Sequence, residues 1–451
     1  MSYTSHKTRA WPLTRLHSRE RGFTLTEMLV ALTAGLVITV AVVGVSRQAS
    51  HIFHEEMRTA SVQSGARFAI ERLSLDLARA GFMSTGNIVA DPLVAKQIGA
   101  ANTAAIPATY VGLRRLSAMR LILGGSKTAT DPQSGLNALN PDALELGGNF
   151  TTTEAFSVRE VAAPSGGCQR LWLQADQAPI WRLLGPGAAA AHAALRNAFK
   201  PSTPSGTEMF MVRIQDSSGR YQFAPTCENA TPAGFENGNP FVDVALNSLG
   251  VGVMTAQLTG TAGGASGYGS GIMVNPVQIA RWEMVSTVGA NVQAGLDPKL
   301  ESARFYLTRT FVDAKGVVIE STREVIGEYV VDLKFAFVVE TGDSTNTAHT
   351  IFAFEDSSNA LWSYDVSSQA PSSQGPQRIR SVRVRLAMRT PLPDRMADIS
   401  PNPANLSGQR FMHRYCVGAT AAVCTNGSEN FARVRTLTTE LSLPNQQRWF
   451  Y

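Results

Sequence analysis

The spacing of apolar residues divides the chain into three stretches. Met28–Ser46 is a run of 19 residues without a charged side chain, and as a helix it would extend about 28 Å, roughly the thickness of a bilayer core. From Arg47 to Ala80 apolar residues recur every three or four positions, which is typical of a helix with one buried face. Gly81 is a natural helix stop, and beyond it apolar and polar residues alternate as in half-buried strands. The pattern predicts an α+β fold in which one long N-terminal helix, transmembrane and then amphipathic, packs on a mostly antiparallel β-rich head.

Eight stretches of the head are predicted strands. Alternation is clearest at Val382–Met388 and Leu437–Leu443. The other six are Met209–Gln215, Val277–Ser286, Arg304–Val312, Val317–Glu320, Val330–Glu340 and Ile351–Phe354. Turn residues at Asn237-Gly238 and at Ala314-Lys315-Gly316 predict two hairpins.

The head is long for a single sheet packed on one helix. It spans 370 residues, from Phe82 to Tyr451, so we expect insertions with boundaries that the pattern leaves open. Three segments rich in turn-forming or small residues are candidates: Gly124–Asn149, Pro186–Gly206 and Gly260–Gly271.

Composition and charge narrow the class of protein. A chain of 451 residues with 44% hydrophobic and 17% charged residues is neither disordered throughout nor a many-span membrane protein. Residues 1–22 hold five basic residues against one acidic residue, a net +4 of the chain's +5. The high pI is therefore a property of the N-terminus and does not indicate nucleic-acid binding. A basic segment before a single apolar run predicts one span with residues 1–22 in the cytoplasm.

The N-terminus does not have the pattern of an ordinary secretory signal. Such a signal has small residues after its apolar run, whereas here Gly22 precedes the run, and cleavage there would keep the helix in the mature chain. Glu27 lies near the start of the apolar helix, where an unpaired carboxylate is costly in lipid. It either caps the helix in the headgroup region or pairs with a new α-amine exposed on Phe23.

The residues from Arg21 to Leu32, RGFTLTEMLVAL, resemble the class III signal of type IV prepilins and type II secretion pseudopilins. The resemblance implies that a prepilin peptidase cuts after Gly22 and methylates Phe23, and that Glu27 meets a neighbour's N-terminus during assembly. It also implies a pilin-like fold with four parts: a leader at 1–22, a transmembrane and assembly helix at 23–46, an amphipathic half-helix at 47–81 and a periplasmic head at 82–451.

A second segment, Ser64–Phe82, resembles the end of the first helix in PilW-type minor pilins, where Gly-Arg-Phe, Leu-x-x-Asp-Leu and Ala-Gly-aromatic recur. This chain departs from that pattern with Gly65-Ala-Arg-Phe, which is one residue wider. The stretch Glu328–Phe337 also resembles a late strand of these proteins. Within the helix we expect Arg72 and Asp76 to form a surface pair four residues apart.

The resemblance implies a structural protein without enzymatic activity or cofactor. It would sit in the bacterial inner membrane and later at the pilus tip on the cell surface, helping to start pilus assembly. Its implied partners are the prepilin peptidase, other minor pilins, the major pilin, a large tip adhesin and inner-membrane lipid. From the charge distribution we do not expect nucleic acid as a partner. The alternatives are a J-type pseudopilin of type II secretion, whose head is usually far shorter, and a membrane-anchored enzyme, DNA-uptake receptor or adhesion receptor.

Four cysteines lie beyond the predicted span, and a periplasmic head would permit disulfides. Three connectivities are possible. We favour Cys168–Cys227 and Cys416–Cys424 because these pairs close the shorter loops. Zinc binding is the alternative, although neither pair has close spacing and only His413 lies near a cysteine.

Motifs that could carry chemistry are isolated and do not form an enzyme's constellation. His51 and His54 could hold a metal but are better explained as interfacial residues. Gly124–Thr128 lacks the pattern of a phosphate loop. Gly263–Gly271 contains loose glycine repeats but opens no obvious helix and lacks the spacing of a nucleophile elbow, so a flexible loop is the better interpretation. A set of arginines predicts a basic strand face, either solvated, buried between subunits or phosphate-binding: 378, 380, 383, 385 and 389.

Overall fold

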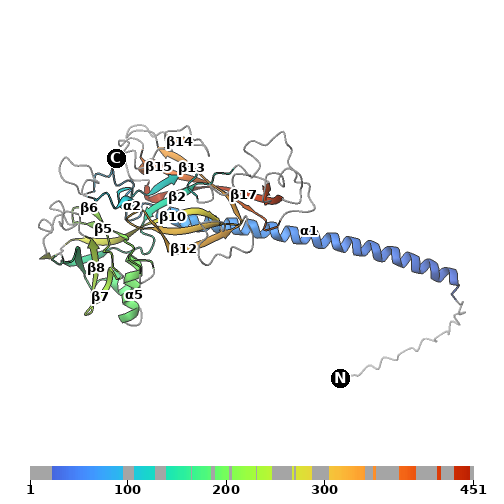
Figure 1. The fold of residues 1–451 in the computed structure, drawn as a ribbon, viewed down its shortest axis with the longest axis horizontal. Helices are drawn as coiled ribbons and strands as arrows, with labels where there is room; N and C mark the ends of the chain where they lie inside the picture. The colour runs from blue at the N-terminus through green and yellow to red at the C-terminus, as the bar shows by residue number, and fades with distance from the viewer. Residues whose placement is uncertain are drawn as a thin grey trace, which may run out of the picture. The chain divides into compact units, whose positions relative to one another are not determined.

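The structure, a computed structural model, describes residues 23–94, 106–126, 139–163, 165–183, 188–202, 206–229, 231–245, 267–268, 271–286, 304–340, 349–351, 375–392, 414–417 and 431–446. The chain divides into two compact units, Met1–Met57 and Arg58–Tyr451. Helix α1 (Leu25–Arg79) begins in the first unit and ends in the second. The remaining described elements belong to the second unit and are mostly strands (Figure 1).

The strands form two sheets, and every strand pair in the described part of the chain is antiparallel. The large sheet contains β1 (Met119–Ile122), β2 (Ala143–Gly148), β3 (Phe156–Val161), β4 (Cys168–Leu173), β5 (Met211–Gln215), β6 (Tyr221–Pro225), β7 (Ala233–Glu236), β8 (Asn239–Ala245), β9 (Gly267–Tyr268), β10 (Met273–Ser286), β11 (Phe305–Val312) and β12 (Val318–Glu328). The second sheet contains β13 (Val330–Glu340), β14 (His349–Ile351), β15 (Ile379–Arg389), β16 (Arg414–Cys416) and β17 (Phe431–Ser442) in the order β14-β13-β15-β17-β16. The short helices are α2 (Val111–Arg114), α4 (Ala178–Leu183), α5 (Ala188–Phe199) and the 3-10 turns η4 (Pro376–Arg378) and η8 (Pro444–Gln446).

Strand β10 joins two parts of the large sheet. Its first half pairs with β3 and β5, and its second half pairs with β2 and β11. The first half therefore belongs to a lobe, which we define as the described residues between Phe156 and Val274. The lobe has its own apolar core, in which strands β3, β4, β5 and β8 pack with helices α4 and α5. It is the mainly green part of Figure 1.

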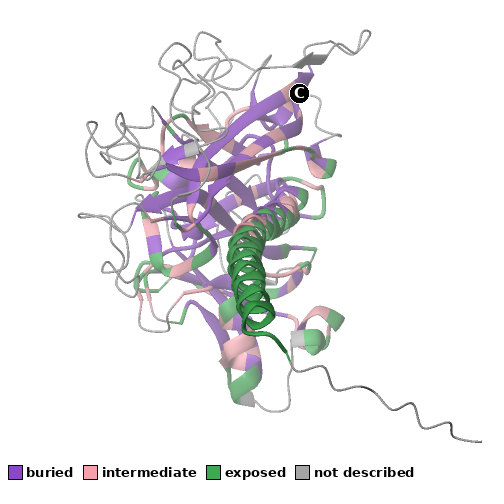
Figure 2. Cartoon of the chain, turned by 90° about the vertical axis from the view of Figure 1, so that its right-hand side faces the viewer, coloured by how far each residue is buried: buried purple, intermediate pink, exposed green. Residues whose placement is uncertain are grey.

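The main core lies between the second half of α1 and the two sheets. One continuous apolar cluster includes Leu73 and Leu77 from α1, Trp282 from β10, and Phe335 and Val384 from the second sheet. Figure 2 shows the strands of both sheets buried over most of their length, while the first half of α1 is exposed. Burial of this apolar surface is the main force that holds the helix to the sheets.

A buried polar contact ties the two sheets together next to β2. The Asp142 backbone N–H donates to the Leu333 carbonyl at 2.9 Å, and Lys334 Nζ donates to Asp142 Oδ1 at 3.1 Å. Burial raises the pKa of the Asp142 carboxyl, and the Lys334 ammonium opposes that rise. The ion pair therefore satisfies two charges that would otherwise be costly between the sheets.

The sequence pattern predicted these elements well. Strand β13 has the predicted bounds, and β5, β10, β11, β12, β15 and β17 overlap their predicted stretches. Both predicted hairpins are confirmed: Asn237 and Gly238 have positive φ between β7 and β8, and Gly316 has positive φ between β11 and β12. Gly81, with φ of 76°, follows α1 and donates to the Gly147 carbonyl at 2.8 Å, as a helix stop should.

The three predicted insertions stay predictions. Gly124–Asn149 contains β2, which pairs with β1 and β10 inside the large sheet, and residues 127–138 lie outside the described part of the chain. Pro186–Gly206 contributes helix α5 to the lobe. Gly260–Gly271 lies mostly outside the described residues. Only Ile351 of the predicted strand Ile351–Phe354 falls within them, as the end of β14.

Candidate assembly site

Helix α1 begins with a reciprocal cap formed by Thr24 and Glu27. The Thr24 backbone N–H and its hydroxyl both donate to Glu27 Oε2, at 3.0 and 2.9 Å, and the Glu27 backbone N–H donates to Thr24 Oγ1 at 3.3 Å. This is a capping box, in which Thr24 is the N-cap and Glu27 is the third helical residue. The box needs an oxygen acceptor from residue 27 but not its charge, because glutamine serves equally at this position. The cap therefore explains where the Glu27 side chain lies, but it does not explain why this residue carries a negative charge.

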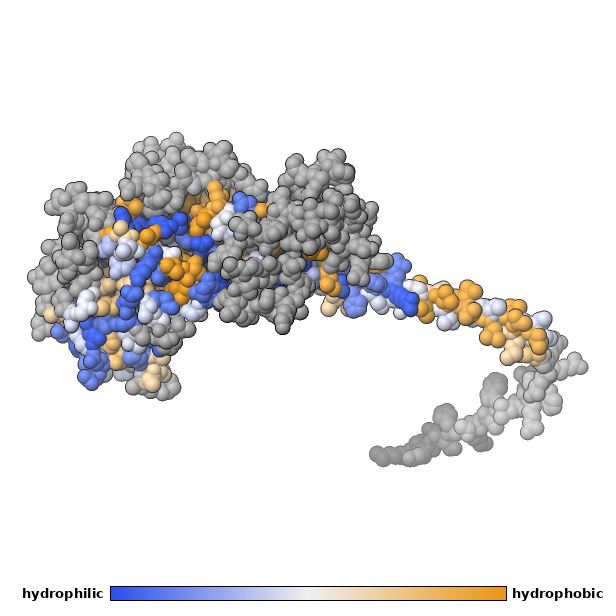
Figure 3. All heavy atoms as spheres, viewed as in Figure 1, coloured by the Kyte–Doolittle hydropathy of each residue, from blue (hydrophilic) through white to orange (hydrophobic). Residues whose placement is uncertain are grey.

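The helix that follows exposes apolar side chains all round. Its large residues from Leu25 to Val45 are exposed, as is Phe23 before them, with 82% of its surface accessible. In Figure 3 this part of the helix carries mainly hydrophobic residues and turns hydrophilic further along. Among the described helices, α1 is long and apolar enough to cross a membrane. A surface of this kind must be covered by lipid or by other apolar helices.

Asp76 anchors the second half of α1 to the large sheet. Only 3% of its surface is exposed. Arg309 Nε of β11 donates to Asp76 Oδ2 at 2.5 Å, and Trp282 Nε1 of β10 donates to the same oxygen at 3.0 Å. The carboxylate thereby holds two strands and the helix at one point.

The prediction of a surface pair between Arg72 and Asp76 is wrong. Asp76 lies between Leu73 and Leu77 on the buried face, whereas Arg72 lies at the edge of the helix and pairs with Glu324 of β12 at 3.2 Å. A carboxylate set inside the apolar stripe was the available signal, because it must find a buried partner there. That partner, Arg309, lies 233 residues further along the chain, so no pattern near Asp76 could identify it.

Gly65 faces the second sheet where α1 contacts β15. An added Cβ at Gly65 would lie 3.4 Å from Met388 Cε, the end of a flexible side chain. Gly65 of the Gly65-Ala-Arg-Phe segment is therefore in contact with the head, with little spare space beside it.

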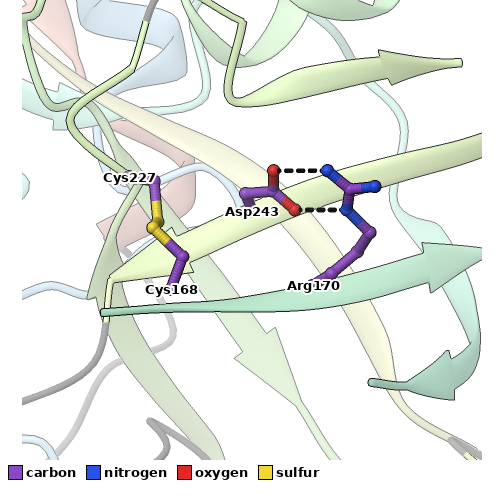
Figure 4. Close-up of a disulfide and its surroundings, with 4 residues drawn as sticks. All are labelled: Cys168, Arg170, Cys227 and Asp243. Carbon is purple, nitrogen blue, oxygen red and sulfur yellow. Dashed lines mark hydrogen bonds and ion pairs between the residues drawn. A yellow bond between two sulfur atoms is a disulfide. The ribbon is translucent and has the colours of Figure 1, made fainter. Parts of the chain in front are cut away.

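A disulfide joins Cys168 and Cys227 within the lobe, which confirms one of the two predicted pairs. It connects the start of β4 to the segment after β6, closing a loop with a sequence separation of 59 residues (Figure 4). Beside it, Arg170 forms a two-pronged pair with Asp243, through Nε at 2.8 Å and Nη2 at 3.0 Å. The hydrogen bond that Arg170 donates to Asp243 raises the pKa of Arg170, because it stabilises the charged guanidinium. Cys416 ends β16 and Cys424 lies outside the described residues, so the second pair stays a prediction.

The isolated motifs do not assemble into a site within the described residues. His51 and His54 are exposed on α1, and no group of three or more potential metal ligands occurs in the described ranges. The Gly124 N–H donates to Asp142 Oδ1 at 3.0 Å, so it is already bonded to a carboxylate, which would repel a phosphate. Most of Gly263–Gly271, together with Lys127, Thr128 and His413, lies outside the described part of the chain.

The arginines of the predicted basic face are bonded within the head. Three of them form ion pairs: Arg380 with Glu340 at 2.6 Å, Arg383 with Glu440 at 3.3 Å and Arg385 with Asp332 at 3.2 Å. Arg389 is buried and donates to the carbonyls of Thr390 and Pro391. Pairing of this kind favours a structural role over phosphate binding, because the positive charge is neutralised locally.

Together, a long N-terminal helix packed by its second half on antiparallel sheets and an exposed apolar first half define a pilin-like protein. Proteins of this class are typically structural and not enzymatic. The chain matches the prokaryotic N-terminal methylation motif over residues 17–43, so it has a type IV prepilin-like N-terminus. The motif implies processing by a prepilin peptidase, and with the apolar helix it indicates a membrane-anchored protein. Comparison with curated proteins and with solved structures found no match to this chain.

Proposed function

We propose that this chain is a PilW-type minor pilin that helps to initiate type IV pilus assembly in a tip complex with other minor pilins. The observation that carries the proposal is the prepilin-type N-terminus directly ahead of an exposed apolar helix. A helix that only anchored a receptor would need length and apolarity, but it would not need a carboxylate in its first turn or a methylation motif. Assembly by helix–helix and head–head contacts uses all of these features.

We assign a location or fate to each of the four parts of the chain. Residues 1–22 are removed, 23–46 lie in the inner membrane and later among other pilin helices, 47–81 connect to the head, and 82–451 form the periplasmic head. The disulfide between Cys168 and Cys227 supports this compartment, because such bonds persist in oxidising surroundings. After assembly the head would be at the pilus tip, beside the other minor pilins, the major pilin and a large tip adhesin.

The charge of Glu27 supports the assembly role. Where apolar helices bundle, water is scarce, and a carboxylate must find a cation or lose its charge. The α-amine that cleavage would create on Phe23 is the nearest such cation in a neighbouring subunit. Within its own chain, Glu27 already accepts two hydrogen bonds from Thr24, which leaves the charge available for a neighbour.

We expect cleavage after Gly22 and methylation of Phe23. The peptidase must accept the small Gly22 next to the bulky Phe23, so Gly22→Leu should leave nearly all of the protein with its leader. Mass spectrometry of the protein from cells with and without the peptidase measures both the new terminus and the methyl group. A wild-type N-terminus other than N-methylated Phe23 would contradict the assignment.

Deletion of the gene tests the proposed role directly. We expect surface pili, counted by electron microscopy, to fall at least about tenfold, while the amounts of the other prepilins in the membrane stay unchanged, because only initiation is lost. Expression of the intact chain should restore the pili. A secretion defect with normal pili would instead identify a J-type pseudopilin. Normal pili with normal secretion would indicate a receptor or enzyme for which the helix is only an anchor.

A further inference from the structure

The second half of α1 has a regular row of residues on the side that faces away from the core. Ser64, Phe68, Glu71, Leu75 and Ala78 are all exposed and follow one another at intervals of four, three, four and three. Phe68 and Leu75 are large apolar residues with 57% and 59% of their surface accessible. This spacing is the heptad repeat with which one helix packs against another. We call these five residues the outer seam.

Glu71 restricts which helices can pack on the outer seam. It lies between the two large apolar residues and forms no ion pair within the described part of the chain. A polar residue inside a heptad seam sets the register and the choice of partner, because the facing helix must satisfy it. The partner helix must therefore present a basic side chain opposite Glu71 and allow space opposite Phe68.

The first half of α1 in a second copy of this chain meets both requirements. Arg47 lies on that helix, and Gly44, three residues before it, has no atom within 4 Å of the position of an added Cβ. Val40, Gly44, Arg47 and His51 repeat at intervals of four, three and four. If Arg47 faces Glu71 in a parallel pair, then Gly44 faces Phe68 and Val40 faces Ser64. These two pairs each combine a large side chain with a small one, as facing helices do when they interlock, and Leu75 faces His51.

We infer that the outer seam binds the Val40–His51 segment of a second copy in this register. The offset between Glu71 and Arg47 is 24 residues, an axial shift of about 36 Å. Two helices that span the same bilayer cannot be shifted so far, so the contact forms only when one copy has moved relative to the membrane. The inference rests on the proposed function in this respect, since only an assembling subunit leaves its place in the membrane.

Crosslinking of the full-length protein in detergent micelles tests the seam, because no bilayer fixes the helices there. Two copies with different tags carry Phe68→Cys and Gly44→Cys, and a bismaleimide links free thiols. We expect at least tenfold more crosslinked pair than with Arg67→Cys and Gly44→Cys, since Arg67 is exposed beside the seam but is not part of it. The protein without added cysteines gives the background from the native cysteines. Resistance of the head to trypsin shows that each variant is folded.

Charge reversal tests whether Glu71 pairs with Arg47 across the seam. Glu71→Arg in the copy that carries Phe68→Cys should lower the crosslinked fraction to that of the control pair, and Arg47→Glu in the other copy should restore it. Equal crosslinking in the seam and control pairs, or no effect of Glu71→Arg, would overturn the inference. The seam and the proposed function can fail separately. If the seam pair crosslinks but deletion of the gene leaves pili intact, the seam is supported and the proposed function is wrong. If the seam pair does not crosslink but deletion abolishes pili, the seam is wrong and the proposed function is supported.

Discussion

Replacing Glu27 by Gln should abolish incorporation of the protein into pili while leaving its synthesis, processing and head structure unchanged. The amide oxygen keeps the capping box with Thr24, so the start of the helix is preserved. What the variant lacks is the charge that would face a neighbour's Phe23 α-amine. An unpaired charge among packed helices costs about 3 kcal/mol, which is roughly a hundredfold in an equilibrium constant. Recovery of tagged protein with purified pili, relative to its amount in the membrane, measures the loss.

Thr24→Ala is the matched control, because it breaks the same capping box from the other side and keeps the charge. Loss of the threonine cap should cost about 1 kcal/mol of local helix stability, and we expect recovery with pili close to that of the wild type. If Thr24→Ala loses incorporation and Glu27→Gln keeps it, Glu27 is a helix cap and the charge-pairing role is wrong. Mass spectrometry of the mature N-terminus in each variant excludes a processing defect.

Replacing Asp76 by Ala should destabilise the second unit by about 3–5 kcal/mol, the usual cost of removing one partner of a buried ion pair. Among the described residues, Arg309 would keep only the more distant Glu324, at 3.9 Å, as an acidic partner, and the Trp282 N–H would lose its acceptor. Denaturant unfolding of the full chain in mild detergent, followed by tryptophan fluorescence, reports the change. Asp76→Asn should cost less, because the amide oxygen can still accept from Trp282.

Arg72→Ala supplies the comparison on the same helix. Arg72 pairs with Glu324 at the surface, where such pairs contribute about 0–1 kcal/mol. We therefore expect a loss several times smaller than that caused by Asp76→Ala. Similar losses in the two variants would show that Asp76 does not anchor the helix.

The N-terminal part of the candidate site could be read from the sequence because its signals are local. Gly22, Phe23 and Glu27 lie within six residues ahead of an uninterrupted apolar run, and the methylation motif covers the same stretch. Strands β15 and β17 of the second sheet were also predictable, because their apolar and polar residues alternate between a more buried and a less buried face. Thr24 was not singled out, although a threonine three residues before a glutamate at a helix start is a known cap pattern.

The contacts between distant parts of the chain could not be read in this way. The alternating pattern of β10 marks a strand, but not that its two halves pair with different partners, β3 and β5 on one side and β2 and β11 on the other. The lobe includes helix α5 from the predicted insertion Pro186–Gly206, but its bounds follow from these pairings and not from the local pattern. The pairing of Cys168 with Cys227 was favoured only by loop length. Strand β8 brings the two sulfurs together, because it pairs with β4 at Cys168 and also contacts Thr226 and Cys227.

The sequence by itself therefore determined the processing signal, the apolar helix, the helix stop at Gly81 and the α+β class, since each depends on residues close together in the chain. The tertiary structure decided which strands the apolar face of α1 meets. It places Asp76 beside Arg309 in the core and leaves Phe68, Glu71 and Leu75 exposed on the other side. The physical reason is that the apolar stripe of a helix sets only its own orientation, whereas the partner of a buried charge is set by strands hundreds of residues away.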